Sequence, residues 1–129
     1  MPAASSIRVL VVDDQLTMRA LVRSALQQIG FSDVSEAPDG EEGLKTLIAK
    51  GCQLVISDYN MPKMDGLDFL RAIRSHEPTR KTAFIMLTGR SDKELVQRAI
   101  QYGVNNYIAK PFTTVGLKQK IEAVFGALT

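Results

Sequence analysis

The chain has 129 residues, of which 45% are hydrophobic and 23% are charged, and its formal net charge is +2. This composition is ordinary for a soluble globular domain and excludes collagen, a coiled coil and an intrinsically disordered chain. The length fits one domain with one hydrophobic core. No apolar run approaches the roughly eighteen residues that a membrane span needs. One cysteine and a start without the basic and apolar segments of a signal peptide favour a cytoplasmic location.

The charges are unevenly distributed along the chain. Residues 1–89 carry ten Lys and Arg against eleven Asp and Glu, whereas residues 90–129 carry six against three. A surplus this small, without a basic run and without Trp, is a poor footprint for nucleic acid, which needs several clustered phosphate contacts. A surface for a protein partner in the C-terminal part is the better interpretation. Neither nucleic acid nor a membrane is an expected partner.

Short apolar segments alternate with amphipathic ones along the whole chain. The first apolar run, residues 7–12, stops at Asp13-Asp14, as a strand buried on both faces would. Residues 18–29 follow with apolar side chains at the spacing of one helix face, and Gly30-Phe31 fits a helix end. Further strands are predicted at 33–37, 54–57, 83–87 and 106–108. Further helices are predicted through 44–48, from 65 to about 73, over about 92–102 and through 117–128.

Five strand–helix units joined by short connections predict an α/β fold of the doubly wound, flavodoxin-like (βα)5 type. The expected sheet is parallel, has five strands in the order 2-1-3-4-5 and carries helices on both faces. Residues 1–6 are expected to form a flexible N-terminus, and residues 7–129 a single domain. The sequence contains no linker, low-complexity tract or repeat that would indicate a second domain.

Polar side chains stand where four of the five predicted strands end: Asp13 with Asp14, Asp58, Thr88 and Lys110. In a doubly wound sheet, ligands bind beyond the carboxyl ends of the strands, where the strand order reverses, so these side chains are expected to converge. Two carboxylates about 4 Å apart repel by roughly 4 kcal/mol unless they are protonated or joined by a cation. Mg²⁺ suits such oxygen ligands in a shallow site.

The same residues suit phosphoryl transfer. An ionised, well-placed aspartate can attack phosphorus, and Asp58 is the predicted nucleophile. Mg²⁺ and the Lys110 ammonium would neutralise phosphoryl oxygens, and Thr88 would donate a hydrogen bond to them. Each residue alone also has an ordinary interpretation, the acidic pair as a solvated turn or helix cap and the others as loop residues. Their joint placement at the strand ends favours a site.

Four motifs extend this pattern beyond the strand ends. They are Val9 to Asp14 with Thr17-Met18-Arg19, Ser57 to Gly66, Leu87-Thr88-Gly89, and Asn106 to Phe112. On these motifs, which span nearly the whole chain, the sequence resembles the receiver domains of two-component response regulators, and most closely the single-domain chemotaxis regulators among them.

The resemblance implies a role for each residue at the strand ends. Asp58 would accept a phosphoryl group from a histidine kinase (CheA-like). Asp14 would ligate Mg²⁺ directly, Asp13 would act through water, Asn60 would lend its backbone carbonyl, and Asp58 would complete the metal site. Lys110 would contact the phosphoryl oxygens, and its peptide bond to Pro111 would be cis. Such a protein is a signalling switch that catalyses its own phosphorylation and slow dephosphorylation, not an enzyme acting on other substrates.

The resemblance also implies a switched surface. Phosphorylation would draw Thr88 to the phosphoryl group, Tyr107 would turn from exposed to buried, and the surface of the fourth helix, fifth strand and fifth helix would change. Asn60 and Arg90 are expected to tune the lifetime of the phosphorylated state. This surface carries four basic residues, Lys93, Arg98, Lys118 and Lys120, so an acidic partner segment would fit it. The single-domain length and Tyr107 favour a flagellar switch protein (FliM-like) as that partner.

Three other functions stay open. A Mg²⁺-dependent phosphatase of the haloacid dehalogenase type has a similar site, but it carries a second aspartate two positions after its nucleophile, where this chain has Asn60, whose amide cannot transfer the proton. A stand-alone receiver that acts as a phosphate sink or phosphorelay intermediate has the same site chemistry. A binding module independent of phosphorylation would not need the intact acidic set. Three further residues are interpreted as structural: Cys52, His76 and, as a helix cap, Asp65.

Overall fold

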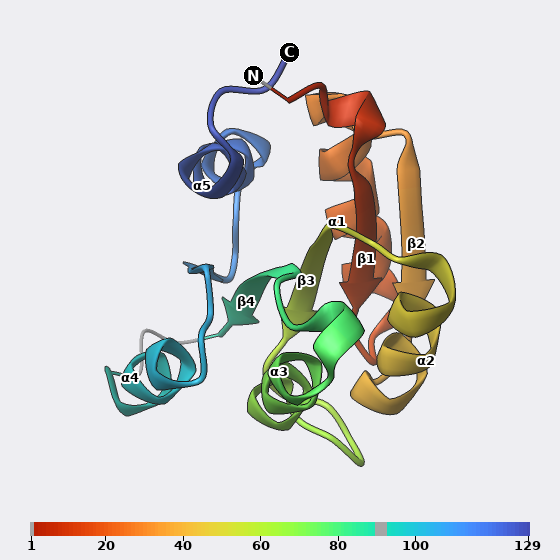
Figure 1. Ribbon diagram of the computed structural model, residues 1–129. Coiled ribbons are helices and arrows are strands. Elements are labelled where there is room, and N and C mark those ends of the chain that lie inside the picture. Colours follow the sequence, from red (N-terminus) through yellow and green to blue (C-terminus); the bar gives the residue numbers. More distant parts are fainter. Residues whose placement is uncertain (1, 90–92) are drawn as a thin grey trace.

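The computed structural model describes residues 2–89 and 93–129, and in this part of the chain five parallel strands form one sheet. The strand order is β2-β1-β3-β4-β5, as predicted, so β1 and β3 are neighbours (Figure 1). The predicted ranges agree with the strands to within one residue at either end. The strands are β1 (Arg8–Val12), β2 (Asp33–Ala37), β3 (Leu54–Asp58), β4 (Ala83–Thr88) and β5 (Asn106–Ala109).

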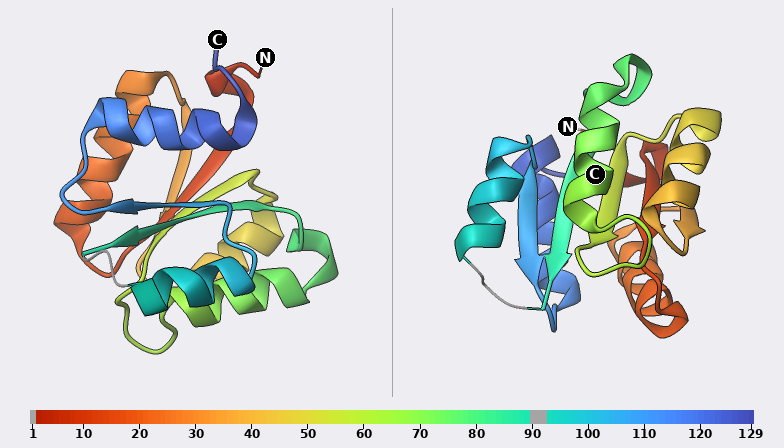
Figure 2. Two further views of the ribbon diagram at one scale, coloured as in Figure 1. Left: turned by 90° about the vertical axis from the view of Figure 1, so that its left-hand side faces the viewer. Right: turned by 90° about the horizontal axis from the view of Figure 1, so that it is seen from below.

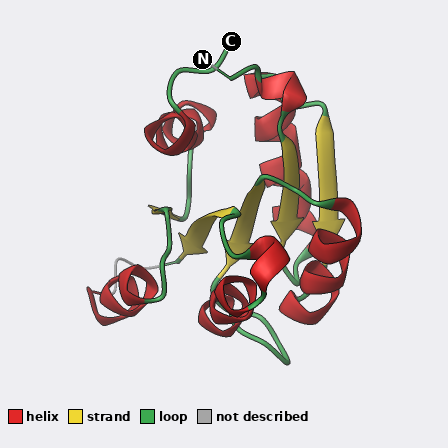
Figure 3. Ribbon diagram, viewed as in Figure 1, coloured by secondary structure: helices red, strands yellow, loops and turns green. Residues whose placement is uncertain are grey.

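Helices cover both faces of this sheet (Figure 3). Helices α1 and α5 lie on one face, and α2, α3 and α4 lie on the other (Figure 2). The described part of the chain contains α1 (Leu16–Ile29), α2 (Gly40–Lys50), α3 (Gly66–Ser75), α4 (Lys93–Gln101) and α5 (Thr114–Phe125). The predicted doubly wound α/β fold is confirmed.

The strand sequences explain the two-sided core. In β1, Val9 and Val11 belong to the cluster under α1 and α5, whereas Leu10 and Val12 belong to the cluster under α2, α3 and α4. All four are fully buried, because side chains alternate between the two faces and helices cover both. Strands β3 and β4 are also buried along their whole length. Polar side chains at the ends of such strands are poorly explained by packing alone.

Side-chain caps explain where three of the helices begin. Asp39, Asp65 and Thr113 stand before α2, α3 and α5, and each accepts a hydrogen bond from the N–H three residues further on, at 2.8–2.9 Å. The interpretation of Asp65 as a helix cap is therefore confirmed. Helix α5 ends at Phe125, earlier than expected, and Gly126 follows it with φ +87°. The predicted start of the fourth helix at residue 92 lies outside the described residues.

The N-terminal residues, expected to be flexible, lie beside the C-terminus (Figure 1). Ala4–Ser6 form a short 3-10 turn in which Ala4 is buried. The Ala4 N–H donates to the Thr129 carbonyl at 3.3 Å, and the Thr129 N–H donates to the Pro2 carbonyl at 3.0 Å. The flexibility of this segment stays a prediction. Among the described residues, no helix is both long and apolar enough to cross a membrane.

Candidate acidic and phosphoryl site

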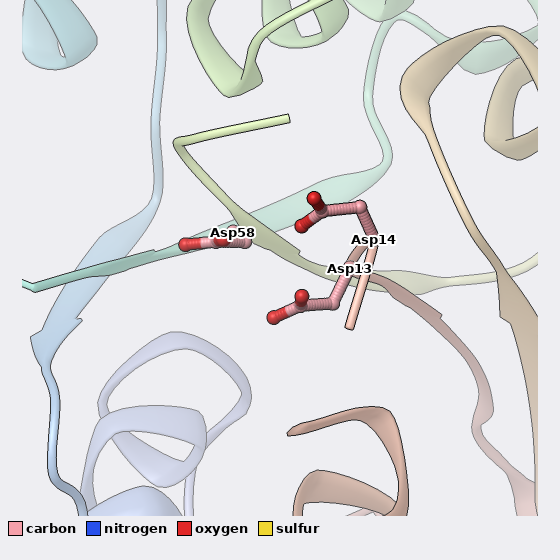
Figure 4. A group of neighbouring side chains, drawn as sticks. All are labelled: Asp13, Asp14 and Asp58. Atoms are coloured by element: carbon pink, nitrogen blue, oxygen red, sulfur yellow. The ribbon is translucent and has the colours of Figure 1, made fainter. Parts of the chain in front are cut away.

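The predicted site residues meet at the carboxyl ends of the strands. Asp13 directly follows β1, Asp58 is the last residue of β3, Thr88 is the last of β4, and Lys110 directly follows β5. Because β1 and β3 pair side by side, Asp13, Asp14 and Asp58 lie close together (Figure 4). Asp13 and Asp58 are buried, whereas Asp14 is exposed. The predicted convergence of Asp13, Asp14 and Asp58 is therefore observed.

The three aspartates form a compact acidic cluster. Each offers one carboxylate oxygen, and these oxygens all lie within 4.8 Å of one another. The backbone N–H of Gln15 donates to Asp13 Oδ1 at 2.9 Å, but Asp13 Oδ2 is buried and has no hydrogen-bond partner among the described residues. Burial raises the pKa of the Asp13 carboxyl, and the charges of Asp58 and Asp14 raise it further, against the opposing effects of the Gln15 hydrogen bond and Lys110.

Lys110 supplies a positive charge from the loop after β5. Its Nζ lies 2.8 Å from Asp58 Oδ1 and 3.7 Å from Asp13 Oδ2. The backbone N–H of Lys110 donates to the Thr88 carbonyl at 2.7 Å, which continues the β4–β5 pairing by one residue. The peptide bond from Lys110 to Pro111 is cis, as the resemblance implied. The sheet thus fixes the backbone of Lys110, and the Lys110 ammonium lies against the acidic cluster.

The chemistry of this donor set fits a hard divalent cation. Three carboxylates and one ammonium, if all are ionised, leave an excess of two negative charges. All the side-chain donors of the cluster are oxygens, and a buried oxygen without a hydrogen-bond partner in the described structure is a ready ligand. Mg²⁺ prefers such oxygens and needs only a few of them from the protein. The residues present therefore fit the expected metal.

An open cleft of about 560 Å³ gives access to the cluster from solvent. Asp14, Asp58 and Lys110 contribute its charged part. Asn60, to which the resemblance gave a role at the site, lines the cleft as well, and the remaining lining residues are Gln15, Met61, Pro62 and Gly89. The cleft has room for a phosphoryl group beside a hydrated ion. Arg90, expected to act on the lifetime of the phosphorylated state, lies outside the described residues.

Thr88 and Tyr107 lie on paired neighbouring strands. Thr88 is 4% exposed and pairs with Ala109 of β5, two residues after Tyr107. Tyr107 is half-buried rather than exposed, and it lines a surface pocket with three residues of α4: Lys93, Val96 and Gln97. The Lys120 ammonium of α5 lies 5.1 Å from the centre of the Tyr107 ring. The ring thus connects β5 to both helices of the expected docking surface.

The residues interpreted as structural lie away from this cleft. Cys52 is buried just before β3, and burial raises the pKa of its thiol. His76 directly follows α3. Arg19 of α1 was not predicted to have a role, yet its guanidinium donates to the Asp13 carbonyl at 2.7 Å. Its place in the Thr17-Met18-Arg19 motif was the only signal in the sequence, because a single side-chain contact with the loop six residues earlier leaves no periodic pattern.

Comparison with known proteins places this arrangement in context. The family described as "Response regulator receiver domain" matches residues 9–122. A probable chemotaxis protein CheY of Rhizobium etli is 55% identical over 128 residues, covering 99% of both chains. The chemotaxis protein CheY of Pseudomonas aeruginosa is 39% identical over 118 residues, covering 92% of this chain and 95% of the relative.

Solved structures of chemotaxis proteins and receiver domains have a fold similar to that of this chain. Vibrio cholerae chemotaxis protein CheY4 superposes with a TM-score of 0.86 at 32% identity, covering 96% of this chain and 99% of the other. The receiver domain of the sensor histidine kinase PA1611 from Pseudomonas aeruginosa superposes with a TM-score of 0.84 at 25% identity, covering 94% of this chain and 98% of that one. That structure has a magnesium ion coordinated in its active site cleft.

Proposed function

Because this chain belongs to the family of response regulator receiver domains and resembles CheY proteins over almost its full length, we propose that it is a cytoplasmic, phosphorylation-controlled switch of chemotaxis. It would accept a phosphoryl group on Asp58 from a CheA-like histidine kinase. The observation that carries this proposal is the position of Asp58, which lies in an open cleft 2.8 Å from the Lys110 ammonium and within 4.8 Å of two further carboxylates.

The proposed reaction needs an ionised carboxylate that can reach phosphorus. An oxygen of Asp58 attacks the phosphorus of the phosphorylated histidine, and the bond from phosphorus to the imidazole nitrogen breaks. The electron pair of that bond leaves with the imidazole. Lys110 Nζ lies within reach of the new aspartyl phosphate and can exchange its contact with Asp58 Oδ1 for one with a phosphoryl oxygen. The charge that enters the site is thereby balanced in part by the protein.

Mg²⁺ is the proposed cofactor. Asp13, Asp14, Asp58 and the backbone carbonyl of Asn60 would hold it, and when bound it neutralises charge on the carboxylates and the transferring phosphoryl group. The acidic cluster and the buried Asp13 Oδ2 support this assignment. The magnesium ion in the related receiver domain supports it as well. The Lys110 ammonium, which lies 2.8 Å from Asp58 Oδ1 and 3.7 Å from Asp13 Oδ2, opposes part of the repulsion among the three carboxylates.

We propose that the chain is a switch rather than an enzyme acting on other substrates. A haloacid dehalogenase-type phosphatase needs a proton-transferring aspartate where this chain has Asn60. The aspartyl phosphate would therefore be lost slowly, at a rate tuned by Asn60 and Arg90. A phosphate sink or phosphorelay intermediate uses the same site chemistry, and only the downstream partner distinguishes it from a motor regulator.

The proposed output surface comprises α4, β5 and α5. When Asp58 is phosphorylated, Thr88 would move toward the phosphoryl group and the half-buried Tyr107 ring would turn further inward. Thr88 and Tyr107 lie on paired neighbouring strands, so a movement of the Thr88 side chain would take place close to the Tyr107 ring. The surface carries the basic residues Lys93, Arg98, Lys118 and Lys120 and suits an acidic segment of a FliM-like flagellar switch protein.

The phosphorylation chemistry is tested by intact mass spectrometry after incubation with acetyl phosphate and Mg²⁺. One phosphoryl adduct is expected, and it should be absent after chelation and in Asp58→Ala. Asp65→Ala is the matched control, because Asp65 is an aspartate that caps α3 outside the cluster, and this variant should form the adduct. No adduct on the folded wild-type protein would contradict the proposal and favour a module that binds without phosphorylation.

The output is tested by binding of a flagellar switch protein segment to the phosphorylated and unphosphorylated chain. Tighter binding of the phosphorylated form is expected, and Tyr107→Ala should reduce the difference between the two forms. Equal binding of both forms would contradict the motor role and leave the phosphate sink or relay as the better function.

A further inference from the structure

We propose that Arg19 is a positioning residue of the metal site, which holds the main chain of Asp13 so that the three carboxylates stay together before Mg²⁺ arrives. The inference rests on the proposed function, because it takes the acidic cluster to be a Mg²⁺ site. Arg19 belongs to α1, and its side chain contacts the backbone of the acidic loop, residues 13–15, which joins β1 to α1.

Two hydrogen bonds fix the main chain of Asp13. Its N–H donates to the Ala37 carbonyl of β2 at 3.2 Å, one residue beyond the last β1–β2 pair. Its carbonyl accepts from the guanidinium Nη1 of Arg19 at 2.7 Å. Since Arg19 lies in the first turn of α1, this second bond ties the acidic loop to the helix that follows it.

Arg19 is itself held in place. Its Nε lies 3.3 Å from Glu36 Oε1, and its side chain is only 15% exposed. Glu36 stands next to Ala37 in β2, so the contacts close a ring that runs from Asp13 to Arg19, on to β2 and back to Asp13. Glu36 Oε2 also accepts from Arg23 at 2.7 Å, so Glu36 keeps a cationic partner if Arg19 is replaced.

The carboxylates need such a restraint because they repel one another at the separations observed. Asp58 belongs to β3 and is paired with Lys110, so it has little freedom to move away. Asp14 is exposed and can turn toward water. Rotation of the peptide that joins Asp13 to Asp14 would also separate the charges, because it would turn the Asp14 side chain away from the other two carboxylates. Arg19 opposes that rotation, because the oxygen that it binds belongs to this same peptide.

The contact made by Arg19 and the charge of Arg19 act in opposite directions on Mg²⁺ binding. A nearby positive charge repels the ion, so removal of the charge alone would strengthen binding, whereas removal of the bond to Asp13 would weaken it. Arg23 is a matched control, since it lies one turn further along the same helix and pairs with the same Glu36. Among the described contacts, the Arg23 side chain makes none with Asp13.

The test is a titration of the full chain with MgCl₂ at fixed ionic strength, followed by two-dimensional amide NMR. Arg19→Gln should raise the Kd for Mg²⁺ roughly tenfold, as loss of an outer partner of a metal ligand commonly does. Arg23→Gln should change it less than about twofold. Arg19→Lys keeps the charge but lacks the two separate nitrogens with which Arg19 contacts Asp13 and Glu36, so its Kd should lie between those of the wild type and Arg19→Gln. A purely structural role would lower Tm without changing the Kd of the folded protein.

Each outcome decides the inference. An unchanged Kd in Arg19→Gln, or an equal rise in Arg23→Gln, would overturn it while leaving the metal site intact. Should Arg19→Gln fail to fold, Arg19→Lys carries the test, and a Kd equal to that of the wild type would overturn the inference. If the folded wild-type protein showed no Mg²⁺-dependent shifts, the metal part of the proposed function would fail, and this inference with it.

Discussion

Replacing Gly66 with Ala should destabilise the protein and disturb the phosphorylation site together. Gly66 is the first residue of α3, and its N–H donates to the Tyr59 carbonyl at 2.7 Å. A Cβ at this position would lie 2.7 Å from the Asp58 carbonyl oxygen, 2.7 Å from Met86 Sδ and 2.8 Å from Tyr59 Cα. Two of these three neighbours are backbone atoms of the phosphoacceptor segment, so they cannot move aside without moving Asp58.

The expected size of the effect follows from two opposing contributions. Overpacking of a well-packed site costs about 1–3 kcal/mol, and the better helix propensity of alanine returns at most about 1 kcal/mol. A net loss of roughly 1–2 kcal/mol should lower Tm by about 3–10 °C for a domain of this size. Because the displaced backbone carries Asp58, phosphorylation by acetyl phosphate should also be slower in Gly66→Ala.

Gly89→Ala is the matched control, because a Cβ at Gly89 would meet nothing within 4 Å. Its backbone lies outside the left-handed region, so alanine should leave stability unchanged or raise it by about 0.4–1 kcal/mol through the unfolded chain. Both variants are measured by urea denaturation and thermal unfolding. Equal stability of Gly66→Ala and Gly89→Ala would refute the close approach on which this prediction depends.

Three further predictions concern stability. Asp13→Asn should stabilise the metal-free protein at pH 7. The Asp13 pKa in the folded state lies above its ordinary value of 3.8, so the folded protein favours the protonated carboxyl. The stability of the wild type therefore falls as the pH rises from 3.8 through the folded-state pKa, and the asparagine variant escapes this loss. The gain in Tm should vanish below about pH 3.8, and a gain that persists there would contradict the titration argument. Arg74→Ala should lower the free energy of unfolding in urea by about 2–3 kcal/mol, because the half-buried guanidinium donates to the carbonyls of Gly103, Arg80 and Thr82 and to the Asn105 side chain. Arg71→Ala is the control: it removes only the contact with the Tyr102 ring and should lower the free energy of unfolding by less than about 1 kcal/mol. Equal costs would count against that network. Lys63 has φ +68°, so Lys63→Asn should be more stable than Lys63→Val by at least about 1 kcal/mol in the same assay, and the reverse order would disprove a left-handed conformation there.

The sheet and the acidic cluster were predictable because their signals are local. Buried strands read as short apolar runs, and the rule that ligands bind at the carboxyl ends of such strands selects Asp13, Asp58 and Lys110 from the sequence alone. Helix ends were less predictable. Helix α1 begins after Gln15, whose side chain makes no capping hydrogen bond, so the sequence offers no start signal there.

Contacts between a side chain and the backbone of another segment were not predictable in the same way. The Arg74 guanidinium joins the end of α3 to the segments before β4 and β5, and nothing in its sequence neighbourhood indicates these partners. The bond from Arg19 to the Asp13 carbonyl depends on the path of the loop between β1 and α1. The short 3-10 turn at Glu77–Thr79 was likewise not predicted, because three residues are too few to show a periodic pattern.

The central claim, that Asp58 receives the phosphoryl group, is tested most directly by chemical trapping. The protein is incubated with acetyl phosphate and Mg²⁺, reduced with borohydride and digested with trypsin, so that an aspartyl phosphate becomes homoserine. The expected peptides separate the candidates: residues 51–63 contain Asp58 as their only acidic side chain, residues 9–19 contain Asp13 and Asp14, and residues 64–71 contain Asp65 and Asp68. Homoserine in peptide 51–63 alone is the predicted result. Homoserine in either of the other two peptides, or in none, would contradict the account.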